Sequence, residues 1–139
     1  MEINKLLKTS VEKKASDLHL VVGHRPVVRI DTAIKHLEEF PILTASESKR
    51  MIESILTTQQ KTKFHEEKEL DFSYEINNVG RFRINLFWEK DNIALVARVI
   101  SKDIPTLEQL GLNTTVENLI KEKQGLILVT GPTGCGKST

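Results

Sequence analysis

The residues with the most evident chemistry are the nine at the end of the printed sequence, which form a glycine-rich loop. Residues 131–139 read Gly-Pro-Thr-Gly-Cys-Gly-Lys-Ser-Thr and fit the pattern G-x-x-x-x-G-K-[ST]. In such a loop, backbone N–H groups surround the phosphates of a nucleotide, the lysine contacts the β- and γ-phosphate oxygens, and the next hydroxyl binds Mg²⁺. We therefore predict a site for ATP and Mg²⁺ in which Lys137 binds phosphate and Ser138 binds the metal. The residues expected to contact nucleotide are Thr133, Gly134, Cys135, Gly136, Lys137, Ser138 and Thr139.

An apolar run leads directly into this loop. Residues 126–129 read Leu-Ile-Leu-Val, which predicts a parallel strand buried on both faces. A helix is expected to begin near Lys137, with its N-terminal dipole directed at the bound anion. The alternative interpretation is a glycine-rich turn without a ligand.

Cys135 is the single cysteine of the chain and lies inside the predicted loop. One cysteine cannot form an intramolecular disulfide and fits a reducing compartment. Two roles stay open for this residue. In the first, it contributes only its backbone N–H. In the second, nearby amides and Lys137 favour the thiolate, so that oxidation or alkylation would block nucleotide binding.

The composition gives no electrostatic argument for a polyanionic partner. Lys and Arg number 20 against 19 Asp and Glu, and the net charge is +1. Such a chain has no general attraction to DNA, RNA or anionic lipid, so nucleic acid is not an expected partner. No run approaches the roughly 18 apolar residues of a membrane span, and the first twenty residues lack an apolar core long enough for a signal peptide. We expect a cytoplasmic protein without direct membrane insertion.

Hydrophobic periodicity predicts an α+β fold with a mostly antiparallel sheet. Helical spacing of apolar residues marks approximately residues 1–14, 44–56 and 58–66. Strand-like patterns mark approximately residues 18–22, 27–30, 33–37, 72–76, 82–86 and 93–100. Thr44 and Glu47 are spaced as a capping box, as are Thr114 and Glu117. The expected organisation is a first domain over residues 1–101, a linker over 102–112, and the start of a second domain over 113–139.

Arginines interrupt two of the predicted strands. Arg81 and Arg83 alternate with apolar residues and therefore share one face of their strand. A face of this kind is usually only solvated. Arg98 stands in an otherwise apolar strand, where a guanidinium needs a carboxylate or a phosphate as partner.

The remaining polar residues form no recognisable catalytic or metal-binding pattern. His19 has no second ligand at metal-binding spacing and is expected to be structural. Asp17 is expected to cap or turn the chain between the first helix and the first strand. Asp31 has two possible roles, either in a turn or facing a nucleotide. No Ser/His/Asp arrangement is recognisable.

Several segments together resemble one protein family. Residues 15–20 (ASDLHL), 28–31 (VRID), 80–87 (GRFRINLF) and 125–134 (GLILVTGPTG) resemble the corresponding stretches of the PilT-type pilus-retraction ATPases, the motors of twitching motility. The resemblance covers essentially the whole chain, in the order and at the spacing of the family. The broader family also includes secretion and pilus-assembly ATPases.

The resemblance implies a PAS-like N-terminal domain joined by a short linker to a RecA-like ATPase domain. It also implies a cytoplasmic homohexamer at the base of a type IV pilus, with the inner-membrane platform protein of the pilus as a partner. In such hexamers, two arginines of the N-terminal domain, fifteen residues apart, reach the bound nucleotide. Arg83 and Arg98 have this separation (98 − 83 = 15). The resemblance thus assigns them as arginine fingers acting in trans, with Arg81 a weaker candidate.

Two positions depart from the family pattern. Thr32 stands where the family commonly has glycine after Arg-Ile-Asp, so the turn there is expected to differ. Cys135 replaces a usual serine, which should leave phosphate binding intact because this position acts through its backbone.

The family's remaining catalytic motifs, namely the glutamate base, the Walker B segment and a histidine motif, would follow Thr139. We therefore expect the 139-residue polypeptide alone to hydrolyse no ATP. The alternatives to a retraction motor are a type II secretion or pilus-assembly ATPase of the same superfamily, and a non-catalytic interaction module with a vestigial phosphate loop.

Overall fold

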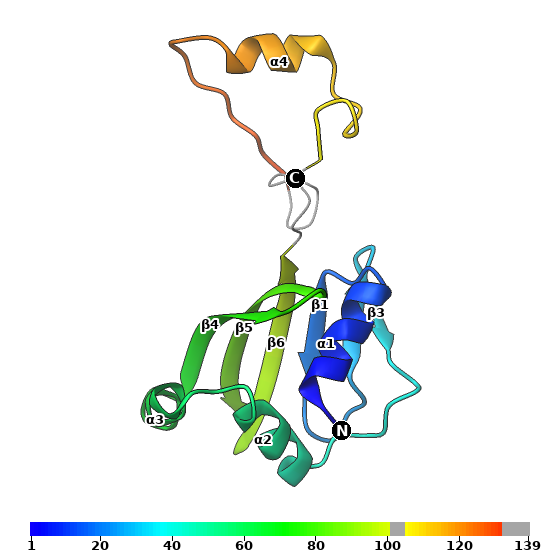
Figure 1. Cartoon of the computed structure of the whole chain (residues 1–139), viewed down its shortest axis with the longest axis vertical. Coiled ribbons are helices and arrows are strands. Elements are labelled where there is room, and N and C mark those ends of the chain that lie inside the picture. Colours follow the sequence, from blue (N-terminus) through cyan, green and yellow to red (C-terminus); the bar gives the residue numbers. More distant parts are fainter. Residues whose placement is uncertain (101–104, 132–139) are drawn as a thin grey trace. The chain divides into compact units, whose positions relative to one another are not determined.

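The computed structural model describes residues 1–100 and 105–131 (Figure 1). The chain divides into two compact units, Met1–Ser101 and Lys102–Thr139, which are considered separately. The helices are α1 (Ile3–Glu12), α2 (Ala45–Glu53), α3 (Thr58–Glu67) and α4 (Thr114–Ile120). The strands are β1 (Asp17–Leu20), β2 (Val27–Ile30), β3 (Ala33–His36), β4 (Glu69–Ile76), β5 (Gly80–Glu89) and β6 (Asn92–Ile100). The predicted α+β class is confirmed.

One six-stranded sheet organises the first unit, in the order β3-β2-β1-β6-β5-β4. Every neighbouring pair is antiparallel. The pairing of β1 with β6 brings the first strand against the last, at the centre of the sheet. The predicted strand over residues 93–100 therefore forms, and it lies at the centre of the sheet.

The three helices of this unit cover one face of the sheet, and the core lies between them and the strands. In α1, the stripe predicted from helical spacing is buried, with Leu6 and Leu7 inaccessible to solvent. On the sheet, the alternate residues Phe82, Ile84 and Leu86 of β5 are fully buried. The period of two in the strand therefore places one complete set of side chains in the core and the other set on the opposite face. We call that opposite face the open face.

Capping boxes fix where α2 and α3 begin. In α2, the backbone N–H of Glu47 donates to Thr44 Oγ1 at 3.3 Å, and the N–H of Thr44 donates to Glu47 Oε2 at 3.3 Å. These reciprocal bonds satisfy two N–H groups that the first helical turn leaves without partners. Thr57 and Gln60 make the same arrangement at the start of α3. The prediction for α2 is confirmed, and Phe64 is the buried residue of α3.

The connection between β2 and β3 is a two-residue turn in which both residues are left-handed. Asp31 has φ of 48° and Thr32 has φ of 69°, while Ile30 pairs with Ala33 across the turn. Two positive φ values in a two-residue hairpin match a type I′ turn, which favours glycine or asparagine. A β-branched residue is strained in this region. Thr32 therefore keeps a conformation that glycine would adopt with less strain.

The second unit contains α4 and an extended segment. The N-cap of α4 is Asn113, whose Oδ1 accepts from the N–H of Thr115 at 3.1 Å. The capping box predicted at Thr114 and Glu117 is thus wrong by one position at its N-cap. The strand predicted over residues 126–129 is not formed, and Leu126 is 81% exposed. A strand requires a hydrogen-bonded neighbour, and all of the strands described belong to the first unit.

Candidate functional site

The predicted phosphate loop lies mostly outside the described residues. This applies to Thr133, Gly134, Cys135, Gly136, Lys137, Ser138 and Thr139. The candidate site that the structure does describe is on the open face of the sheet, where the two predicted arginine fingers are located.

Four charged residues from adjacent strands form a row across the open face. Arg29 of β2 pairs with Asp17 of β1, Asp17 pairs with Arg98 of β6, and Arg98 pairs with Arg83 of β5. We call these four residues the arginine row. Because directly opposed residues in an antiparallel sheet lie on the same face, with Cβ atoms about 5 Å apart, the row places three guanidinium groups on one surface. The sheet therefore brings Arg83 and Arg98 together, as their predicted shared role requires.

Asp17 is the centre of the row and is buried, at 5% exposure. Its Oδ1 accepts from Arg98 Nε at 3.0 Å, and its Oδ2 lies 3.4 Å from Arg29 Nε. Ser16 Oγ also donates to Oδ2, at 2.9 Å. A carboxylate this far from solvent needs such partners, because an isolated buried charge is very costly. The expectation that Arg98 requires a carboxylate or phosphate partner is confirmed, and the partner is Asp17.

The protonation state of Asp17 follows from these contacts. Burial raises the pKa of Asp17, but the hydrogen bonds from Arg98 and Ser16 and the positive charge of Arg98 together lower it below the ordinary range. Asp17 is consequently ionised at neutral pH. The prediction that Asp17 caps or turns the chain is wrong, because the residue begins β1 and holds two arginines from neighbouring strands.

Arg83 has its own carboxylate on the open face. Its Nε donates to Asp71 Oδ2 at 3.0 Å and to Oδ1 at 3.2 Å, and its Nη2 also donates to Oδ2. These hydrogen bonds lower the pKa of Asp71 and raise that of Arg83. Both side chains are largely exposed, Arg83 at 66%. An exposed pair of this kind stabilises the fold little and can be exchanged for another anion at low cost.

Arg81 lies on the same face, two residues before Arg83 on β5. Its Nη2 donates to Glu75 Oε2 at 3.2 Å, and its Cα is paired with Ile100. The prediction that Arg81 and Arg83 share a face that excludes Phe82 and Ile84 is confirmed, since both arginines are exposed and both apolar residues are buried. Arg81 differs from Arg83 in that no arginine stands opposite it on β6.

His19 neighbours the row on β1 and is uncharged at neutral pH. Burial lowers the pKa of His19, and the positive charges of Arg29 and Arg98 lower it further, although Asp17 opposes the shift. Its cross-strand partners are Val27 and Val96. Within residues 1–100 and 105–131, no cluster of His, Cys, Asp and Glu could hold a metal ion.

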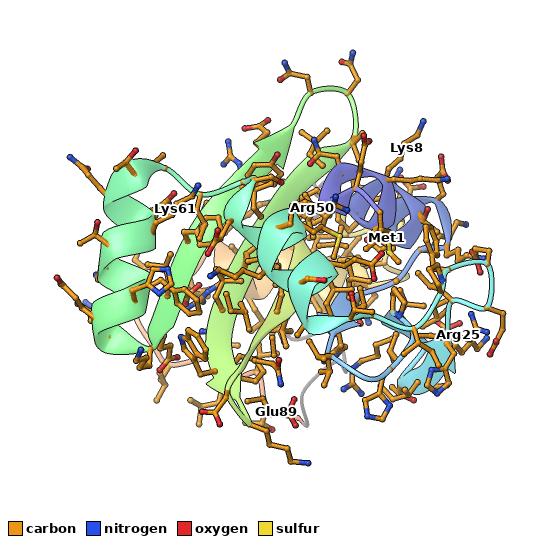
Figure 2. The ribbon with its side chains drawn as sticks, turned by 90° about the horizontal axis from the view of Figure 1, so that it is seen from below. Met1, Lys8, Arg25, Arg50, Lys61 and Glu89 are labelled. Carbon is orange, nitrogen blue, oxygen red and sulfur yellow. The ribbon has the colours of Figure 1, made fainter. Side chains whose placement is uncertain are left out.

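One hollow of the first unit lies away from the arginine row. It is a pocket on the helix side lined by α1, the C-terminal half of α2 and Tyr74, in the region where Met1 and Arg50 are labelled in Figure 2. In this pocket Tyr74 Oη donates to Asn4 Oδ1 at 2.9 Å. Its charged side chains are Glu2 and Arg50. No helix among the described residues is both long and apolar enough to cross a bilayer.

The chemistry available on the open face is recognition of an oxyanion. Two guanidinium groups share Asp17, and Arg83 adds a third with its own carboxylate. Arginine binds phosphate oxygens through planar pairs of N–H donors. Sequence reasoning identified Arg83 and Arg98 but missed Arg29 and the function of Asp17. The signal that could have found them is the alternation in residues 17–20 and 27–30. This alternation puts Asp17 and Arg29 on one face of the sheet and the buried Leu18 and Val28 on the other face.

Comparison with known proteins places the chain in a family of secretion system proteins. Residues 1–139 match the family model described as type II/IV secretion system protein, and the chain belongs to this family. It is 38% identical over its full length to the type IV pilus retractation ATPase PilT of Pseudomonas aeruginosa, and 34% identical to the type IV pilus ATPase PilU of the same organism. It spans 40% and 36% of those two proteins.

A solved structure agrees with this placement. The crystal structure of the pilus retraction motor PilT with bound ADP superposes on the whole chain with a TM-score of 0.81 at 42% identity. The chain covers 40% of that structure. The resemblance to PilT-type proteins stated from the sequence is therefore confirmed. The chain spans less than half the length of each of these relatives.

Proposed function

We propose that this chain is the N-terminal part of a hexameric motor ATPase that couples ATP hydrolysis to retraction of a type IV pilus. The first unit is a PAS-like domain, and residues 113–139 begin a RecA-like domain whose Walker A loop binds Mg-ATP through Lys137 and Ser138. The observation that carries this proposal is the arginine row, because Arg83 and Arg98 are cross-strand partners on one exposed surface.

The two arginines act on the nucleotide of a neighbouring subunit. During phosphoryl transfer, negative charge spreads over the γ-phosphate oxygens, and a guanidinium in contact with them stabilises the transition state. An arginine supplied in trans is worth about 10³- to 10⁵-fold in turnover. Arg83 would exchange Asp71 for phosphate, since both members of that pair are exposed. Arg98 would keep its contact with buried Asp17 through Nε and offer its terminal nitrogens.

The cellular setting follows from the family resemblance. The motor would be a cytoplasmic homohexamer, peripheral to the inner membrane, and would act on the inner-membrane platform protein of the pilus. A type II secretion ATPase is the second candidate, because the chain is also 30% identical to the type II secretion system protein E of Aeromonas hydrophila. The 139-residue chain alone is proposed to be inactive, since the Walker B segment and the glutamate base would lie beyond it.

The test uses the complete ATPase, meaning this chain continued by the rest of the ATPase domain. Arg83→Gln and Arg98→Gln are each expected to lower the turnover number by about 10³-fold or more, with ATP binding retained. Arg81→Gln is the matched control, because Arg81 is exposed on the same strand face and is paired with a carboxylate in the same way. Its turnover should stay within about twofold of the wild type.

Two results would overturn the proposal. One is full turnover in the Arg83→Gln and Arg98→Gln variants. The other is an equal loss in all three variants, which would indicate a general effect of charge on the open face rather than contact with nucleotide. A motility assay distinguishes retraction from secretion. For a retraction motor, cells that lack the motor should regain twitching motility when they receive the wild-type gene, and should not regain it with the variant genes.

A further inference from the structure

Asp17 binds two arginines that come from different strands. One carboxylate oxygen accepts from Arg98 Nε at 3.0 Å, and the other lies 3.4 Å from Arg29 Nε. Both guanidinium groups therefore lie beside the same small group, although their strands are separated by β1. This brings the two groups closer together than the sheet alone would, because strands two apart are about 10 Å from each other.

Each arginine contacts Asp17 through its inner nitrogen, Nε. No hydrogen bond or ion pair connects the Nη atoms of Arg29 or Arg98 to another side chain of residues 1–100 and 105–131. The side chains are 40% and 62% exposed, whereas that of Asp17 is only 8% exposed. The carboxylate is thus fixed below the surface while the terminal donors of both arginines remain available for a ligand.

The charge of this group is unbalanced. Two guanidinium groups and one carboxylate carry one net positive charge, whereas Arg83 is neutralised by Asp71. A bound anion would neutralise this positive charge. Two neighbouring guanidinium groups can donate planar pairs of hydrogen bonds to the tetrahedral oxygens of a phosphate. Ser16 Oγ holds Oδ2 of Asp17 at 2.9 Å and limits rotation of the carboxylate.

We propose that Asp17 is a positioning residue that presents Arg29 and Arg98 together as one receptor for a nucleotide phosphate. Arg29 is then a third arginine of the set, beside Arg83 and Arg98. This inference rests on the proposed function, because it assumes that Arg98 reaches the nucleotide. It goes further in assigning roles to Asp17 and Arg29.

The kinetic test compares Asp17→Asn and Arg29→Gln in the complete ATPase. Each should lower kcat about 10- to 100-fold, the size of effect that misplacement of a catalytic group produces, while KM for ATP changes less than about twofold. In an Arg29→Gln/Arg98→Gln background, the further change of Asp17→Asn should have no additional effect on kcat, because Asp17 acts only through these two arginines. Glu75→Gln is the control, a carboxylate on the same face that pairs with Arg81.

A second measurement does not depend on activity. In ¹⁵N–¹H spectra of this chain, the Nε–H signal of Arg98, which is hydrogen-bonded to Asp17, should exchange slowly with water. It should exchange faster by about tenfold or more in Asp17→Asn, since the buried acceptor has lost its charge. The Nε–H of Arg83, held by Asp71, is the internal reference and should not change.

The outcomes separate this inference from the function on which it rests. If Arg98→Gln keeps full turnover, the proposed function itself fails. If Arg98→Gln is inactive but Arg29→Gln keeps full kcat, the inference fails and the proposed function stands. Additive losses from Asp17→Asn and the two arginine changes would also overturn it. Should Asp17→Asn not fold, Arg29→Gln remains decisive, because that side chain is 40% exposed.

Discussion

Replacement of Arg98 and of Arg83 by alanine should affect stability unequally, although both arginines belong to the same proposed site. Arg98 is a partner of a buried carboxylate, whereas Arg83 pairs with an exposed one. Breaking a buried pair by removing one member costs about 3–5 kcal/mol when the remaining charge has no other partner. Asp17 keeps Arg29 at 3.4 Å and Ser16 Oγ at 2.9 Å, which reduces this cost.

We therefore expect Arg98→Ala to lower the free energy of unfolding by about 1.5 kcal/mol, close to the value of one hydrogen bond to a charged group. For a unit of this size, that corresponds to a fall in Tm of roughly 6–12 °C. Arg83→Ala should leave Tm unchanged within error, because exposed ion pairs contribute little.

The assay is thermal unfolding of the chain followed by far-ultraviolet circular dichroism near pH 7, with urea unfolding as an independent measure. The Tm and the urea midpoint of Arg83→Ala should equal those of the wild type, and both values should be lower for Arg98→Ala. Equal losses for both variants, or no loss for Arg98→Ala, would refute the reasoning that burial of Asp17 makes Arg98 structurally important.

Three further outcomes are expected. The pKa values of Asp17 and Asp71 are lower in the folded state than in the unfolded state. Their contribution to stability is therefore complete above about pH 4 and is lost as the pH falls through the folded-state pKa values. The urea concentration at the unfolding midpoint should be lower at about pH 3 than at about pH 6. Phe82→Ala should cost about 3–5 kcal/mol in urea unfolding, because the ring is fully buried; a loss under about 1 kcal/mol would contradict the described core. Thr32→Gly should raise stability by about 1 kcal/mol by relieving the left-handed turn; a lower Tm would show that the strain is not there.

The fold of the first unit was largely predictable because its signals are local. The alternation of Phe82, Ile84 and Leu86 predicted which face of β5 is buried, and Thr44 with Glu47 predicted the start of α2. These patterns depend on neighbours a few residues apart, so a single sequence contains them. The capping box at Thr57 and Gln60 was equally local and was overlooked.

The centre of the arginine row was not predictable in the same way. Asp17 and Arg98 are 81 residues apart in the chain, and only the pairing of β1 with β6 brings them together. Composition and spacing show that Arg98 needs an anion but not which one. The apolar run at residues 126–129 shows how a local pattern can mislead. The pattern predicts a strand, but a strand needs a hydrogen-bonded neighbour, and the described residues provide none.

The most direct test of the account is complementation between two inactive forms of the complete ATPase. One form carries Arg83→Gln and Arg98→Gln, and the other carries Lys137→Ala. If the arginines act in trans on nucleotide held by the phosphate loop of the neighbour, mixed rings should regain turnover at roughly one interface in four, where an intact loop meets intact arginines. Mixtures with no more turnover than the two forms measured separately would contradict the account.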